Sequence, residues 1–128
     1  MNLLIANRDS ADPQGTQMKY EISPKETEIR ASWDEAKMYC FSLNIDGKIG
    51  WRLPTTEELH NMLMTGTNFT FKYWTTERDT NHAWFMNTKR ILSENKQPWL
   101  KFTKQVVKNY CHKNNLMHVR AVRDLKDY

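Results

Sequence analysis

Residues that cross-link small folds or interrupt regular structure are scarce in this chain. Only two of its 128 residues are cysteines, Cys40 and Cys111, and no second cysteine stands close to either. This spacing excludes a zinc knuckle and a redox dithiol motif. Four glycines and four prolines are too few for a collagen-like, low-complexity or disordered chain. The sequence therefore predicts an ordinary globular protein.

Long apolar runs are missing as well. No stretch approaches the length of a membrane span. Residues 1–9 contain a short apolar run and no basic region, which is not the pattern of a signal peptide. We therefore expect a cytoplasmic protein without membrane contact, or a particle-surface protein if the chain is viral. In a reducing compartment two buried free thiols are the favoured interpretation, and a Cys40–Cys111 bridge is the alternative.

Aromatic residues are plentiful and indicate a real core. The chain has five Trp, five Tyr and five Phe, which bury large areas when they pack. A chain of 128 residues is long enough to form such a core without disulfides or metals, and it is too short for several domains. The prediction is a single domain over residues 1–128.

Charge of one sign is concentrated in the second part of the chain. Residues 1–86 hold nine Lys and Arg against twelve Asp and Glu, whereas residues 87–128 hold ten against three. The net charge changes from −3 to +7 between the two parts. This excess favours an anionic partner, either an acidic protein or a nucleic acid. A solvated face that keeps the protein soluble is the alternative interpretation.

Two segments carry the start signals of amphipathic helices. Pro54 precedes Thr55, whose hydroxyl can accept the backbone N–H of Glu58 while the Glu58 carboxylate accepts the N–H of Thr55. This capping box predicts a helix that ends at Gly66. Ser32 and Glu35 form a second capping box and predict a helix that runs to about Leu43.

Strands are expected on both sides of the two helices. Short strands are predicted at residues 3–5 and 18–22, and residues 73–76 and 82–86 read as an aromatic hairpin. Val119–Arg123 reads as one terminal strand. The segment 97–112 fits a helical stripe or strands, and we favour strand or irregular structure there.

Five short motifs, taken in order, resemble one known pattern. The motifs are Ser32–Cys40, Trp51–Leu59, Tyr73–Thr76, Ala83–Phe85 and Val119–Arg123. They resemble the DUF1566 family, the C-terminal domain of the Legionella collagen-like adhesin. That family is related to the C-type-lectin-like fold shared with formylglycine-generating enzymes, whose Arg-Leu-Pro-Thr helix start is similar to Arg52–Thr55. The resemblance covers about residues 30–124.

The resemblance implies an α+β, C-type-lectin-like domain with two short helices packed on a small, twisted antiparallel sheet and a long irregular loop region. Residues 1–29 would add N-terminal strands and a loop. Between Asn87 and Met117 the chain departs from the pattern, because a long Lys-rich segment with Trp99 and Tyr110 replaces a short Gly- and Ser-rich turn pair. In a binding module, this segment is where we expect the function.

The residue patterns of catalysis and metal binding are missing. The oxidase chemistry of formylglycine-generating enzymes would need paired reactive cysteines, and the C-terminal part has only Cys111. Ca²⁺ needs six to eight oxygen ligands, and no Glu-Pro-Asn or Trp-Asn-Asp triplet is present. No two of the four histidines stand at the i, i+4 spacing of metal ligands. We therefore expect no enzyme activity and no cofactor.

A set of residues in the motifs is assigned to the framework. Arg52 is flanked by apolar residues, so its guanidinium is expected to be partly buried against a carboxylate or carbonyl. Glu57 and Glu58 are explained by the helix start and its dipole. The predicted structural residues are Trp33, Trp51, Arg52, Pro54, Thr55, Glu58 and Trp84.

The basic segment 88–115 is the predicted binding surface of a non-enzymatic module that docks on an acidic protein. The predicted contact residues are Arg90, Lys96, Trp99, Lys101, Lys104, Lys108 and Tyr110. One alternative is a nucleic-acid-binding accessory protein that uses the same face, with aromatic rings stacked on bases. Another is an adhesin module that binds a receptor or glycan. The Asn- and Lys-rich composition would suit a small protein of a phage or other mobile element.

Overall fold

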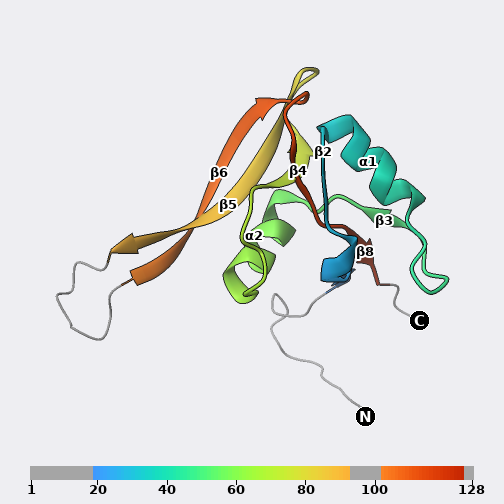
Figure 1. The fold of residues 1–128 in the computed structure, drawn as a ribbon, viewed down its shortest axis with the longest axis horizontal. Coiled ribbons are helices and arrows are strands. Elements are labelled where there is room, and N and C mark those ends of the chain that lie inside the picture. Colours follow the sequence, from blue (N-terminus) through green and yellow to red (C-terminus); the bar gives the residue numbers. More distant parts are fainter. Residues whose placement is uncertain (1–18, 93–101, 126–128) are drawn as a thin grey trace, which may run out of the picture.

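The computed structural model describes residues 19–92 and 102–125, which form two helices and two sheets (Figure 1). The predicted strand at residues 3–5 lies outside the described residues. The helical elements are α1 (Trp33–Ser42), α2 (Thr56–Thr65) and a short 3-10 turn, η3 (Lys25–Thr27). The expected α+β class with two short helices is therefore confirmed.

The strands form two sheets, both mostly antiparallel, with no strand in common among the described residues. The three-stranded sheet has the order β1 (Tyr20–Ile22), β8 (Val122–Asp124), β3 (Trp51–Arg52). The five-stranded sheet has the order β2 (Ile29–Ala31), β7 (Met117–Val119), β4 (Tyr73–Glu77), β5 (His82–Leu92), β6 (Phe102–His112). Only the contact between β4 and β7 is parallel. The predicted hairpin of 73–76 with 82–86 is confirmed by the antiparallel pairing of β4 and β5.

Both predicted helix starts are confirmed. At α2, Glu58 donates its backbone N–H to the Thr55 hydroxyl (3.1 Å), and Thr55 donates its own N–H to the Glu58 carboxylate (2.9 Å). At α1, the Glu35 carboxylate accepts the Ser32 backbone N–H (3.3 Å) and the Ser32 hydroxyl (3.0 Å). α2 ends at Gly66, whose backbone N–H donates to the Met62 carbonyl (2.8 Å), and a Cβ at this position would overlap the Phe69 ring. Each boundary depends on residues three or four positions apart.

Each helix covers its own core cluster. Trp33, Ala36 and Cys40 of α1 pack with Trp74 and Phe85 from the five-stranded sheet. A second cluster joins three α2 residues to strand residues. It consists of Tyr20, Leu59, Met62, Leu63, Phe69, Tyr73, Met86 and Val122. Leu59, Met62 and Leu63 are the buried residues of α2.

The predicted single strand Val119–Arg123 is two strands in different sheets. Between β7 and β8, the Ala121 carbonyl accepts the Ser23 N–H (2.9 Å), and the Ala121 N–H donates to the Ser23 hydroxyl (3.1 Å). Arg120 is buried and donates its Nε–H to the Ser23 carbonyl (2.7 Å). Ser23 therefore satisfies both backbone polar groups of Ala121 where the chain leaves one sheet and enters the other.

The long irregular loop implied by the resemblance is not found in the described part of segment 88–115. Those residues form the far half of β5, the whole of β6 and a turn that leads to β7. The strands pair in unbroken register from His82 with His112 to Leu92 with Phe102. Of the two structures considered for 97–112, strand is confirmed for Phe102–His112. The resulting hairpin projects beyond the rest of the described fold (Figure 1).

Candidate binding surface on the β5–β6 hairpin

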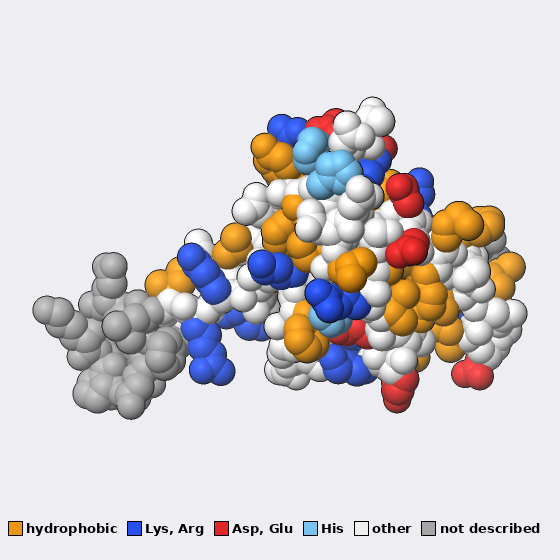
Figure 2. Space-filling view, turned by 45° about the horizontal axis from the view of Figure 1, so that its top comes forward, with side chains coloured by type: hydrophobic (Ala, Val, Ile, Leu, Met, Phe, Trp, Pro, Cys, Tyr) orange, Lys and Arg blue, Asp and Glu red, His pale blue; other side chains and the backbone are white. Residues whose placement is uncertain are grey.

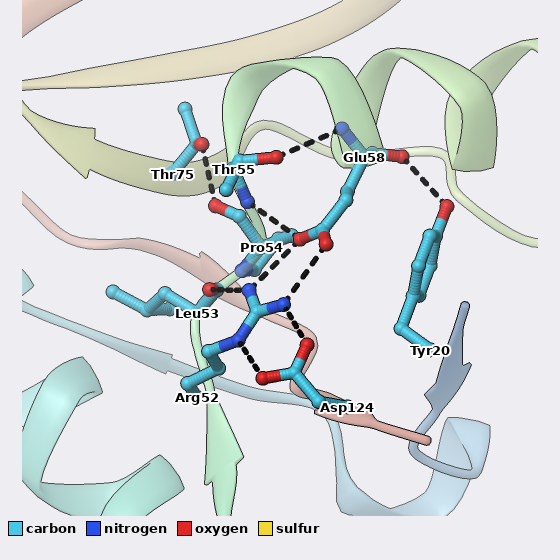
Figure 3. Close-up of polar contacts among 8 residues, drawn as sticks. All are labelled: Tyr20, Arg52, Leu53, Pro54, Thr55, Glu58, Thr75 and Asp124. Atoms are coloured by element: carbon cyan, nitrogen blue, oxygen red, sulfur yellow. Dashed lines mark hydrogen bonds and ion pairs between the residues drawn. The ribbon is translucent and has the colours of Figure 1, made fainter. Parts of the chain in front are cut away.

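The Arg52 turn holds the entrance to α2 (Figure 3). The guanidinium donates two hydrogen bonds to the Glu58 carboxylate (2.8 and 2.9 Å) and a shorter one to Asp124 (2.6 Å). It also donates to the Leu53 carbonyl (3.1 Å). Arg52 holds the pKa of both carboxyl groups below their usual values through these hydrogen bonds. The predicted structural role of Arg52 agrees with this geometry.

Pro54 and Thr75 hold the same turn from the side of the five-stranded sheet. The Pro54 carbonyl accepts the buried hydroxyl of Thr75 on β4 (2.6 Å), which joins the turn to the five-stranded sheet. Tyr20 of β1 donates its hydroxyl to the Glu58 backbone carbonyl (3.3 Å). Figure 3 shows these contacts converging on the start of α2 from the surrounding strands and the preceding turn. Pro54, Thr55 and Glu58 therefore belong to the framework.

Three tryptophans are core residues, and their indole N–H groups all have partners. Trp33 donates to the Thr75 carbonyl (2.9 Å), Trp51 to the Lys48 carbonyl (2.9 Å) and Trp74 to the Ala31 carbonyl (2.8 Å). These bonds let an amphipathic ring lie in the interior. Trp84 is the fourth tryptophan of the motifs. It is half-buried and lies outside both core clusters.

Side-chain alternation places four predicted contact residues on one face of the hairpin. The register pairs Arg90 with Lys104, Met86 with Lys108 and Trp84 with Tyr110. Residues at even positions therefore point to the same side. The two strands carry the cations Lys89, Arg90, Lys104 and Lys108 and no carboxylate. Figure 2 shows basic side chains along this arm, beside the segment drawn in grey.

Lys104 is one of these four cations, yet its ammonium group is engaged inside the fold. It donates to the carbonyls of Leu63 (2.8 Å), Met64 (3.3 Å) and Gly66 (3.1 Å) at the end of α2. A cation at this end satisfies carbonyls that the helix leaves unpaired and complements its dipole. We therefore assign Lys104 to the framework and remove it from the predicted contact set.

Lys108 and Tyr110 lie at the end of the hairpin nearest the β4–β5 turn, in a cation–aromatic cluster. We define this cluster as Arg78, Trp84, Lys108 and Tyr110. The Arg78 guanidinium carbon lies 4.0 Å from the Tyr110 ring centre, and the Lys108 ammonium lies 4.3 Å from the Trp84 ring centre. The two rings meet edge to face at 5.3 Å. Such contacts stabilise a cation without neutralising its charge.

The β4–β5 turn orients the cluster. Asp79 accepts the backbone N–H groups of Asn81 (3.0 Å) and His82 (2.9 Å), and it pairs with Arg78 (2.7 Å) and with the His82 imidazole (2.8 Å). The His82 hydrogen bond is the main cause that lowers the pKa of Asp79 to about 2. Arg78 is thereby fixed between one carboxylate and the Tyr110 ring. The cluster remains accessible, since Tyr110 is 43% exposed.

The remaining predicted contact residues divide into two groups. Arg90 is exposed on β5, directly opposite Lys104. Lys96, Trp99 and Lys101 lie outside the described residues. The structure thus places Lys108 and Tyr110 together and separates them from Arg90. Lys104 instead binds the carbonyls at the end of α2.

Sequence reasoning missed Arg78, which stands in the turn rather than in the basic segment. The strand register could have indicated it. Pairing Trp84 with Tyr110 brings the β4–β5 turn, which carries Arg78, beside the Tyr110 ring. Its motif assigned Trp84 to the framework. Correct pairing of the two strands would have placed it beside Tyr110 and Lys108.

Other classes of site find little support in the described ranges. No group of three or more His, Cys, Asp or Glu side chains there could hold a metal ion. None of the helices in those ranges has the length and apolar character needed to cross a membrane. Both cysteines are free thiols, so the alternative of a Cys40–Cys111 bridge is wrong. Burial raises the pKa of Cys40 to about 12, which leaves it a protonated core residue.

Comparisons with family models, curated proteins and solved structures found no match to this chain. The C-type-lectin-like assignment accordingly stays a prediction.

Proposed function

We propose that this protein is a non-enzymatic binding module that docks on an acidic protein through its β5–β6 hairpin. The observation that carries the proposal is the projecting pair of strands with four cations and no carboxylate. Among the residues that the structure describes, neither Lys89 nor Lys108 has a carboxylate within ion-pair distance. An acidic partner would supply the missing charge and would be steered towards the arm.

The cation–aromatic cluster supplies the apolar contact that charge alone lacks. Trp, Tyr and Arg are the residue types most enriched among interface residues whose truncation costs the most binding energy. Trp84, Tyr110 and Arg78 are already held in place by each other and by the β4–β5 turn, so little side-chain entropy is lost on binding. We place the centre of the interface there, with Lys108 and Arg90 on the same face of the hairpin and Lys89 on the opposite face.

The test is affinity capture from the native cell with charge-reversed bait, in parallel with and without nuclease. The bait is Lys89→Glu with Lys108→Glu, which leaves the α2 cap of Lys104 intact. The control is Lys19→Glu with Lys37→Glu, which makes the same charge change away from the hairpin. The hairpin variant is expected to lose the captured protein at an unchanged thermal midpoint, whereas the control keeps it. Equal capture by both variants would overturn the proposal.

Nucleic-acid binding is the second candidate, and one observation favours it. A two-stranded antiparallel ribbon has the dimensions that the DNA major groove admits, and this ribbon is basic. Nuclease treatment separates the two functions, because it would abolish capture only if nucleic acid bridges bait and prey. If nuclease abolishes capture, an affinity for generic single strands that falls steeply with salt would identify nucleic acid, and not an acidic protein, as the partner. The adhesin alternative rests on the resemblance alone.

A further inference from the structure

A second surface, away from the cation–aromatic cluster, also lacks negative charge. A cleft of about 500 Å³ opens between β2, the connection from α2 to β4, β5 and the start of β7. We call it the Arg30–His118 cleft. Its polar walls include Arg30, Lys72, Asn87 and His118, and its apolar walls include Phe71 and Met117. A few polar groups around an apolar floor are typical of small-molecule sites.

Arg30 and Lys72, the two cations that line this cleft, have no carboxylate partner among the described residues. In the described part of the chain, no Asp or Glu lies within ion-pair distance of Arg30 or Lys72, and no carboxylate lines the cleft. The neighbouring carboxylate, Glu28, is engaged by Arg120 (3.3 Å) and Lys25 (3.6 Å). It also accepts the Tyr73 hydroxyl (3.1 Å). The cleft therefore carries uncompensated positive charge.

His118 adds a flat surface and a free polar edge. Its ring stacks on the Phe71 ring at 4.0 Å with an interplanar angle of 6°. Within the described residues its imidazole nitrogens take part in no hydrogen bond, although its backbone N–H donates to Lys72. Burial, Arg30 and Lys25 lower the pKa of His118, while Glu28 opposes them. The lowered pKa favours the neutral imidazole, which has one N–H to donate.

We propose that the Arg30–His118 cleft binds a small ligand that carries a phosphate or carboxylate group on a flat ring. The anion accepts hydrogen bonds from Arg30, Lys72 and the His118 imidazole. The ring lies against Phe71 and Met117. Arg30 provides the planar fork that matches either anion, and Lys72 provides a point charge. This site does not involve the cation–aromatic cluster or the partner proposed for it.

Titration of the full chain with phenyl phosphate, followed by calorimetry and by the histidine ring signals in NMR spectra, tests the proposal. The signal of His118, assigned with His118→Gln, is expected to shift more than those of His60, His82 and His112. Arg30→Gln and Lys72→Gln are each expected to raise the Kd about tenfold, as for the loss of one charge-assisted hydrogen bond. Lys37→Gln makes the same change on α1 and should leave the Kd unaltered.

Further ligands separate the parts of the proposal. Inorganic phosphate should bind more weakly than phenyl phosphate, and Phe71→Leu should remove that difference. Benzoate reports whether the site takes a carboxylate as well as a phosphate. No saturable binding of phenyl phosphate or benzoate, or a shift that spares His118, overturns the site. The His118 shift is measured on the unaltered chain, so this result stands even if a variant fails to fold.

Discussion

Arg52 and Arg78 are held in two opposite ways, although both are arginines beside a turn. Arg52 lies between the carboxylates of Glu58 and Asp124, and its charge is more than neutralised. Arg78 shares the single carboxylate of Asp79 and then lies over the Tyr110 ring, with Lys108 beside the neighbouring Trp84. At Arg52 the framework pairs its positive charge with carboxylates of the same chain. The hairpin instead holds its cations in place and leaves positive charge for a partner.

The two thiols give the largest expected contrast between framework and hairpin. Cys40 of α1 is fully buried with its pKa raised to about 12, while Cys111 of β6 is partly exposed. Alkylation of Cys40 requires opening of the α1 cluster, so we expect Cys111 to react at least about a hundredfold faster. Mass spectrometry of a timed iodoacetamide reaction measures both rates. Comparable rates would show that α1 is not a stable part of the framework.

Removing the two arginines should separate a structural charge from a surface charge. Arg52→Met leaves two carboxylates without their partner and is expected to lower the free energy of unfolding by about 2 kcal/mol. Arg78→Met is the matched control and should cost less than about 1 kcal/mol, because its contacts are exposed. Urea unfolding measures both values. An equal loss would contradict the division between the two regions.

Lys104 should behave as a framework residue that happens to stand on the hairpin. Lys104→Met leaves three α2 carbonyls without this donor, and we expect a loss of about 1 kcal/mol. Lys89→Met changes the same residue type on the same hairpin, and we expect less than about 0.5 kcal/mol. Chemical denaturation of the two variants is compared with the unaltered chain. If the two losses match, the cap contributes nothing measurable.

Acid should weaken the Arg52 turn, with a smaller effect than removing Arg52, because the ion pairs are partly exposed. The pKa of Glu58 and of Asp124 is lowered in the folded protein, so the unfolded chain binds more protons on acidification. Their contribution is fully present above about pH 4.5 and is lost as the pH falls through the lowered values. In Arg52→Met the fall in thermal midpoint over this range should shrink. An unchanged fall would locate the acid sensitivity elsewhere.

The sequence predicted what depends on neighbours in the chain. The capping boxes of Ser32 and Thr55 involve residues three positions apart, and both form as expected. Arg52 was expected to need a carboxylate, but Asp124 stands 72 residues away and no local pattern points to it. The contact of Lys104 with α2 depends in the same way on how the hairpin lies over the helix.

The basic segment shows why the candidate site was only partly predicted. Alternating β-branched and aromatic residues allowed a strand at Phe102–His112, but its pairing with β5 had to be known before Trp84 and Tyr110 could be placed together. The break between Val119 and Val122 also has a distant cause. Ser23 supplies the hydrogen bonds that end one strand and begin the next, and this residue is remote in the sequence.

The passage of the chain from β7 to β8 determines when the domain can form during synthesis. β7 lies between β2 and β4 in one sheet, and β8 lies between β1 and β3 in the other. Each sheet therefore depends on a strand that emerges after Leu116, β7 in one sheet and β8 in the other. Until a ribosome has extruded the chain through Val119, β2 has no β7 to pair with, and until Asp124 has emerged β1 has no complete β8. The nascent domain consequently stays open through most of its translation and closes both sheets together at a late stage.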